Sequence, residues 1–139
     1  MRIADDELAG RREALAAQLV ERGLAGCALF DPHYVQYYTG FAFIPTERPL
    51  AFVLAADARG GMLVPRLEVE HAQANAAVSE VAHYDEYPGE RHPMEALREL
   101  LDALGVRGRV GADNDGYPWV FGYRGPSLSE LLGATPEPV

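Results

Sequence analysis

The sequence predicts a three-layer α/β domain in which helices cover both faces of a mixed sheet of about five or six strands. A short apolar strand, 27–30, runs directly into a helix that begins near Asp31. Two further apolar runs, 50–56 and 62–64, flank a turn over 57–61 that is rich in Gly and Asp, with Gly60 and Gly61 at its tip, and predict a β-hairpin. A buried antiparallel hairpin beside strand-helix units is typical of a mixed sheet with both faces covered.

The length and composition favour one cytoplasmic domain over residues 1–139. A chain of this size buries roughly 70% of the surface that its unfolded form exposes, so it needs no disulfide or metal for stability. No apolar run is long enough to cross a bilayer or act as a signal peptide. The only cysteine, Cys27, lies in the predicted buried strand, which excludes an intrachain disulfide and fits a reducing compartment.

The charge of the chain excludes two classes of partner. The net charge is −9, and the twelve basic residues are all Arg and are scattered along the sequence. Such a chain repels phosphate groups, so we expect neither nucleic acid nor an anionic membrane as a partner.

The first helix is expected over 5–22, where leucines recur at helical spacing and Gly23 follows. In the next helix Asp31 can cap the first turn, Pro32 already has the required φ, and Gly40 can end the helix in the left-handed conformation. The later elements follow from similar patterns: helices over 66–77, 93–104 and 127–132, strands over 80–84 and 109–113, and a Pro-containing tail over 135–139.

A strand that ends in Asp-Pro, followed by a short helix closing with Tyr, one residue and Thr-Gly-Phe, forms a motif made of Asp31, Pro32, Tyr37, Thr39, Gly40 and Phe41. The motif resembles the N-terminal domain of creatinase, prolidase and aminopeptidase P, the Xaa-Pro peptidase or pita-bread metallopeptidase family. The family usually has Asn in place of Tyr34 and Leu in place of Tyr38, so no role of that Asn can be transferred to this chain.

The resemblance implies that this chain is not catalytic by itself. In the family, two Asp, one His and two Glu hold a pair of divalent metal ions, of the Mn or Zn type, in a separate C-terminal domain that nothing in these 139 residues matches. The implied partners are therefore that catalytic domain of the full-length protein and a second subunit in a homodimer. The implied role is to support dimer assembly and to shape the substrate cleft of a domain that carries out metal-assisted amide hydrolysis.

The acidic and imidazole side chains do not predict a metal site within the chain itself. The segment 113–116, Asp-Asn-Asp-Gly, lacks the spacing and the closing Glu of a calcium loop, and we interpret it as a turn after a strand. His71 has no second His four residues away, so the zinc-protease pattern is absent. We interpret His33 and His83 in the same way, as structural or surface residues.

Two loops are candidates for contact with substrate. Arg48 lies in the first, 41–49, and its guanidinium suits a substrate carboxylate through two parallel hydrogen bonds. The alternative is a solvated Arg48 paired with Glu47 or another acid. Arg91 and His92 lie in the second loop and are weaker candidates.

Two other functions remain open on the sequence. The chain could be a free-standing module that binds a small molecule or regulates another protein. It could also be the front domain of a creatinase-like amidinohydrolase or another hydrolase that is not a peptidase, because those enzymes share this domain. The sequence does not identify the substrate of the full-length protein.

Overall fold

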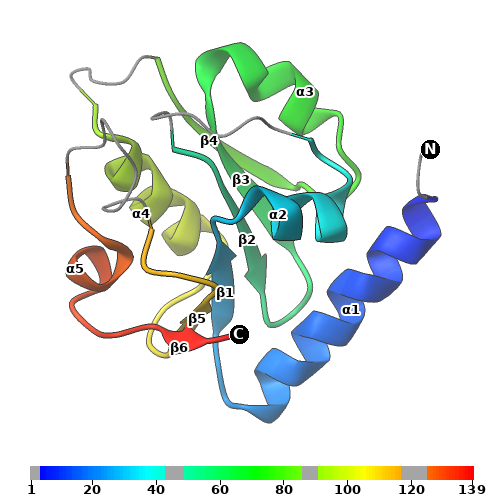
Figure 1. Ribbon diagram of the computed structural model, residues 1–139, viewed down its shortest axis with the longest axis horizontal. Coiled ribbons are helices and arrows are strands. Elements are labelled where there is room, and N and C mark those ends of the chain that lie inside the picture. The colour runs from blue at the N-terminus through cyan, green and yellow to red at the C-terminus, as the bar shows by residue number, and fades with distance from the viewer. Residues whose placement is uncertain (1–3, 43–48, 86–90, 117–124) are drawn as a thin grey trace.

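The computed structural model describes residues 4–42, 49–85, 91–116 and 125–139. Figure 1 shows a sheet with helices packed on both of its sides. In chain order the elements are α1 (Asp5–Glu21), β1 (Gly26–Leu29), α2 (Pro32–Thr39), β2 (Ala51–Ala55), β3 (Gly60–Pro65), the 3-10 turn η1 (Arg66–Glu68), α3 (Val69–Gln73), β4 (Glu80–Tyr84), α4 (Pro93–Ala103), β5 (Val110–Ala112), α5 (Leu128–Leu132) and β6 (Glu137–Pro138).

The six strands form one mixed sheet in the order β4-β3-β2-β1-β5-β6. β2 pairs antiparallel with both β1 and β3, whereas β1 with β5, β5 with β6, and β3 with β4 are parallel pairs. β2 is thus the one strand of this sheet that runs antiparallel to the others. The hairpin of β2 and β3 lies between β1 on one side and β4 on the other. The predicted mixed α/β sheet is therefore confirmed.

Side chains of the central strands alternate between two apolar layers, as the period of a β-strand requires. From β1 and β2, Ala28, Val53 and their face-mates pack with α4 and α5, while Cys27 and Phe52 pack with α1, α2 and α3. Every residue of β1, β2 and β3 is buried, because both faces of these strands are covered. Within the described ranges, no helix is both long enough and apolar enough to span a bilayer.

The end signals read from the sequence are confirmed for α2 and α4. Asp31 accepts a hydrogen bond from the backbone N–H of His33 at 2.8 Å, Pro32 is the first residue of α2, and Gly40 ends the helix with φ +74°. Pro93 opens α4, and Gly105 follows that helix with φ +70°. These signals worked because they depend on local backbone geometry alone.

The turn of the hairpin differs from the prediction. Gly60 and Gly61 are not at its tip but pair with β2 inside β3, and Ala58 takes the positive φ of the turn. A Cβ on Gly60 would lie 2.2 Å from the carbonyl oxygen of Ala77, and one on Gly61 would lie 2.6 Å from Cδ1 of Leu100. The glycines are thus required by close packing against neighbouring elements, which the local sequence does not show.

Three other elements differ from expectation. The helix predicted over 66–77 is only η1 followed by the short α3, and the tail contains β6, which pairs parallel with β5. The spacing of Tyr34, Tyr37, Tyr38 and Phe41 predicts rings along one side of the helix, but Tyr34 and Tyr37 are each 49% exposed, whereas Phe41, which follows α2, is buried. The inward face of α2 is formed by Val35 and Thr39 instead.

Candidate functional site

The turn that follows α2 is held by its own side chains. The hydroxyl of Thr39 donates to the carbonyl oxygen of Val35 at 2.6 Å and accepts from the backbone N–H of Phe41 at 3.0 Å. Gly40 supplies the left-handed residue between them, and its N–H donates to the Gln36 carbonyl at 2.8 Å. The Thr-Gly-Phe part of the motif is therefore a closed hydrogen-bonded turn.

The last carbonyl groups of a helix have no partner within it, and here side chains from other elements supply the partners. Arg11 and Arg12 of α1 donate to the carbonyl oxygens of Tyr37 and Tyr38 at 2.8 Å and 2.7 Å. Asn75, after α3, donates through Nδ2 to the Thr39 carbonyl at 2.8 Å. Three elements thus meet at the end of α2.

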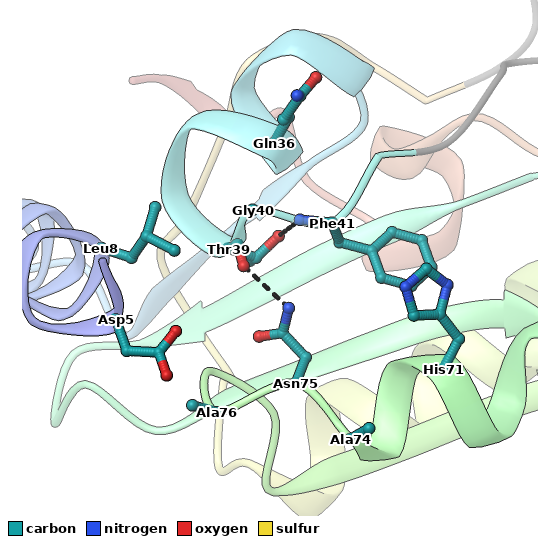
Figure 2. Close-up of a pocket in the computed structure, with 10 residues that line it drawn as sticks. All are labelled: Asp5, Leu8, Gln36, Thr39, Gly40, Phe41, His71, Ala74, Asn75 and Ala76. Carbon is teal, nitrogen blue, oxygen red and sulfur yellow. Dashed lines mark hydrogen bonds between the residues drawn. The ribbon is translucent and has the colours of Figure 1, made fainter. Parts of the chain in front are cut away.

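A cavity of about 690 Å³ lies at this meeting point. Its walls come from the start of α1, the end of α2 and the end of α3 with the residues that follow (Figure 2). The residues that line it are Asp5, Leu8, Gln36, Thr39, Gly40, Phe41, His71, Ala74, Asn75 and Ala76. The volume is in the usual range of small-molecule pockets, roughly 300–1,000 Å³.

The charged groups around the cavity are unevenly placed. Arg12 is only 9% exposed, and burial lowers its pKa, although the nearby Asp5 carboxylate partly offsets that shift. On the other side the ring of His71 lies against that of Phe41, with centroids 4.4 Å apart, and its Nδ1 is 3.3 Å from a Glu68 carboxylate oxygen. Asp5 is therefore the acidic residue that lines the cavity, and Glu68 and Arg12 act on it only through His71 and Asp5.

At the other end of α2, Asp113 joins the ends of β5 and β1. Its carboxylate accepts hydrogen bonds from the N–H groups of Phe30 at 2.9 Å, Asp31 at 2.7 Å and Asn114 at 2.9 Å. Burial raises the pKa of Asp113, while these backbone donors act in the opposite direction. This carboxylate fixes the point at which the chain leaves β1 and enters α2.

The acidic segment 113–116 is used for folding, in agreement with its interpretation as a turn. Besides the contacts of Asp113, the carboxylate of Asp115 accepts from the N–H and the hydroxyl of Ser129, both at 2.7 Å. Within the part of the chain that the structure describes, no three His, Cys, Asp or Glu side chains are grouped to hold a metal ion. The residues that the structure describes do not fit the metal pair of the resembled family.

The structure places two of the three candidate substrate-contact residues. Arg91 forms an ion pair with Glu99 of α4, and His92 caps the same helix by accepting from the N–H of Met94 at 3.0 Å. Neither residue lines the cavity beside α2. Arg48, the first candidate, lies outside the described residues, as do Thr46 and Glu47.

The model of the Creatinase/Prolidase N-terminal domain family matches residues 11–135 of this chain. The chain belongs to the creatinase/prolidase N-terminal domain family. No curated protein sequence gives a significant match.

Several solved structures have a similar fold. A creatinase/prolidase N-terminal domain of an Xaa-Pro dipeptidase from Streptococcus pyogenes is 23% identical with a TM-score of 0.70, over 94% of this chain and 94% of that one. A proline dipeptidase structure from Streptococcus agalactiae is 22% identical with a TM-score of 0.72, over 94% and 92%. Dipeptidase PepE from Mycobacterium ulcerans is 24% identical with a TM-score of 0.71, over 99% of this chain but only 35% of its own.

In this creatinase/prolidase N-terminal domain, sequence reasoning found the motif but missed the residues that hold it. Arg12 has a recognisable signal, because it occupies a position on the inward face of α1 between Leu8 and Leu15, where an apolar residue is expected. Asn75 and Asp113 have no such signal, since their partners lie 36 and about 80 residues away in the chain.

Proposed function

We propose that this chain is the non-catalytic N-terminal domain of an Xaa-Pro peptidase-like metallohydrolase. Its role in the full-length protein is to support assembly of a homodimer and to form part of the wall of the substrate cleft. The chemistry, metal-assisted amide hydrolysis, belongs to a C-terminal catalytic domain that carries a pair of Mn- or Zn-type ions. The proposal includes a cytoplasmic location, supported by the single cysteine, a buried thiol.

The observation that carries this proposal is the extent of the structural match to a full-length dipeptidase. The chain aligns over 99% of its length with 35% of the Mycobacterium ulcerans enzyme. By contrast, it aligns with nearly the whole of the separately solved Streptococcus pyogenes N-terminal domain. A unit that recurs both alone and as one third of an enzyme is suited to a supporting role beside a second domain.

Within this proposal Arg48 contacts the carboxylate of a substrate, and Arg91 and His92 are secondary candidates. Arg91 already pairs with Glu99, and the Nδ1 of His92 caps α4. To contact a substrate, each side chain would have to give up this contact or bind the substrate while keeping it. Arg48 is therefore the first residue to test.

Two measurements test the proposal. Purified 139-residue chain, incubated with Mn²⁺ and alanyl-proline, should release no proline; turnover that survives removal of trace peptidase contradicts the assignment. In the full-length protein, Arg48→Ala should lower kcat/KM for an Xaa-Pro dipeptide, with Arg66→Ala as the control. Arg66 is an exposed arginine of η1 whose nearest acid, Asp85, is 3.8 Å away. Equal kcat/KM for native protein and Arg48→Ala removes Arg48 from the site.

A free-standing binding module remains a second candidate function, and the cavity beside α2 is the observation that favours it. Its volume of about 690 Å³ is sufficient for a small molecule without a second domain. The intact mass of the native protein in its source cell distinguishes the two functions, because a native chain that ends near Val139 favours the free module.

A further inference from the structure

The cavity beside α2 has few backbone N–H groups left to bind a ligand. Several donors on its wall are already used within the fold. The N–H of Gly40 donates to Gln36, the N–H of Phe41 donates to the Thr39 hydroxyl, and Asn75 Nδ2 donates to the Thr39 carbonyl. What remains available to a ligand must therefore come from other groups.

Besides the Gln36 side-chain amide, which can both donate and accept, the cavity carries two acceptors, one from α1 and one from α3. Figure 2 shows the Asp5 carboxylate directed from α1 toward Asn75 and Ala76. Within the described residues Asp5 makes no hydrogen bond or ion pair, although its charge acts on Arg12. Because the Glu68 carboxylate can only accept, the proton of a neutral His71 is assigned to Nδ1, and Nε2 is left as an acceptor.

The remaining electrostatics favour a cation. The last carbonyl oxygens of α2 already accept from Arg11, Arg12 and Asn75, so the Asp5 carboxylate is the negative group that lines the cavity. The chain as a whole has a net charge of −9, which raises the local concentration of small cations. Leu8, Ala74 and Ala76 supply apolar or small surface between the two acceptors.

We propose that this cavity binds a small molecule through a primary ammonium group, with the Asp5 carboxylate as its counter-ion and His71 Nε2 as a second acceptor. An ammonium has three N–H donors and no acceptor, so it can donate to the Asp5 carboxylate and to His71 Nε2, and the amide oxygen of Gln36, which also lines the cavity, can accept as well. The group can belong to the amino terminus of a short peptide or to an aliphatic amine. The proposal concerns residues of this chain alone and does not depend on a catalytic domain.

The test is an NMR titration of the ¹⁵N-labelled 139-residue chain with n-butylammonium at constant ionic strength. Saturable shifts are expected at the amides of Gly40, Ala74 and Ala76. Tetramethylammonium has the same charge but no N–H donor, so it should not saturate the site. Alanine amide and N-acetylalanine amide form a second pair, in which only the first carries the ammonium. Tighter binding of alanine amide than of n-butylammonium identifies a peptide terminus, and the reverse identifies an aliphatic amine.

Three variants decide the roles of the side chains. Asp5→Asn should weaken n-butylammonium binding by up to about fivefold, the upper end of the range for an exposed charge pair. Asp6→Asn is the matched control, since it removes the same charge from the same helical turn but does not line the cavity. His71→Phe keeps a ring beside Phe41 and removes the acceptor, so it should also weaken binding. Equal affinity for tetramethylammonium, equal effects of Asp5→Asn and Asp6→Asn, or no saturable shift at Gly40 would each overturn the proposal.

Discussion

Replacing Arg12 with Met should make the buried thiol of Cys27 accessible to chemical labelling much more often than in the native chain. Arg12 attaches α1 to the end of α2 through its 2.7 Å hydrogen bond to the Tyr38 carbonyl. Cys27 shares an apolar cluster with Leu15 and Leu19 of α1 and is fully buried. Burial raises the pKa of Cys27 to about 12, so the thiol reacts only when the helix opens from the sheet.

The size of the effect follows from the charge and burial of Arg12. A hydrogen bond from a charged group contributes about 1.5–3 kcal/mol, more than a neutral one. Loss of that amount raises the opening equilibrium by about 10-fold to 150-fold, because each 1.4 kcal/mol is a factor of ten. Met keeps much of the aliphatic length of Arg, so the change in packing is small compared with the lost hydrogen bond.

The assay is the rate of iodoacetamide labelling followed by intact mass, at reagent concentrations where closing is faster than labelling. Cys27 is the only cysteine, so each added mass reports this one thiol. Arg11→Met is the matched control: Arg11 bonds the neighbouring Tyr37 carbonyl, but its side chain is 19% exposed and also pairs with Glu7. Because its hydrogen bond is exposed to solvent whereas that of Arg12 is partly buried, its effect should be smaller than that of Arg12→Met. Native labelling rates in Arg12→Met, or an equal effect of Arg11→Met, refute the role given to Arg12.

Three further outcomes are expected. Asp113→Asn should lower the free energy of unfolding by about 1–3 kcal/mol in chemical denaturation, because it removes an acceptor from backbone donors at the β1–α2 joint. Burial raises the pKa of Asp113 in the folded chain above its ordinary 3.8. The free energy of unfolding of the native chain should therefore fall, relative to that of Asp113→Asn, as pH rises from 3.8 through the folded pKa. A difference between the two chains that does not change with pH contradicts this. Gly60→Ala should destabilise more than Gly61→Ala, by melting temperature, because the added methyl meets a backbone carbonyl in the first case and flexible leucine ends in the second; the opposite order contradicts the packing at β3. Arg109 lowers the pKa of Glu137, so the stability that this ion pair gives to β6 is present above pH 4.5 and is lost as pH falls through the lowered folded pKa. When the Glu137 carboxyl is titrated by NMR, the lowering of its pKa should be smaller at high salt. A lowering that does not depend on salt counts against the pair.

The fold was predictable from the sequence where local geometry and periodicity determine it. Asp31, Pro32 and Gly40 set the limits of α2 through capping and backbone preference, and the apolar runs at β2 and β3 are readable because both faces are buried. β6 was not predictable, since a strand of two residues that includes Pro138 is formed only by pairing with β5. Gly60 was placed wrongly for a similar reason: its need for a small residue arises from Ala77 in another segment.

The candidate site was predictable only in part. The Thr-Gly-Phe turn could be read directly, because Thr39 and Gly40 act on residues at most four positions away. The cavity beside it could not be read, because its walls come from three segments that are distant in the chain, with Asp5 and His71 at its sides. Neither residue has a local pattern that marks it as a binding residue. The meeting of α1, α2 and α3 is a result of tertiary packing.

The anchoring of α2 also explains how the chain keeps the family turn while departing from the family motif. Tyr38 stands where the family usually has Leu, yet its contact with Arg12 is made by the backbone carbonyl, which any residue provides. Tyr34 stands where the family usually has Asn, and its side chain is half exposed and is not needed for the apolar layer. The first turn of α2 is fixed instead by Asp31 and Asp113. Because carboxylates hold the start of the helix and Arg12 and Asn75 bond backbone carbonyls at its end, these contacts do not depend on the side chains of Tyr34 and Tyr38.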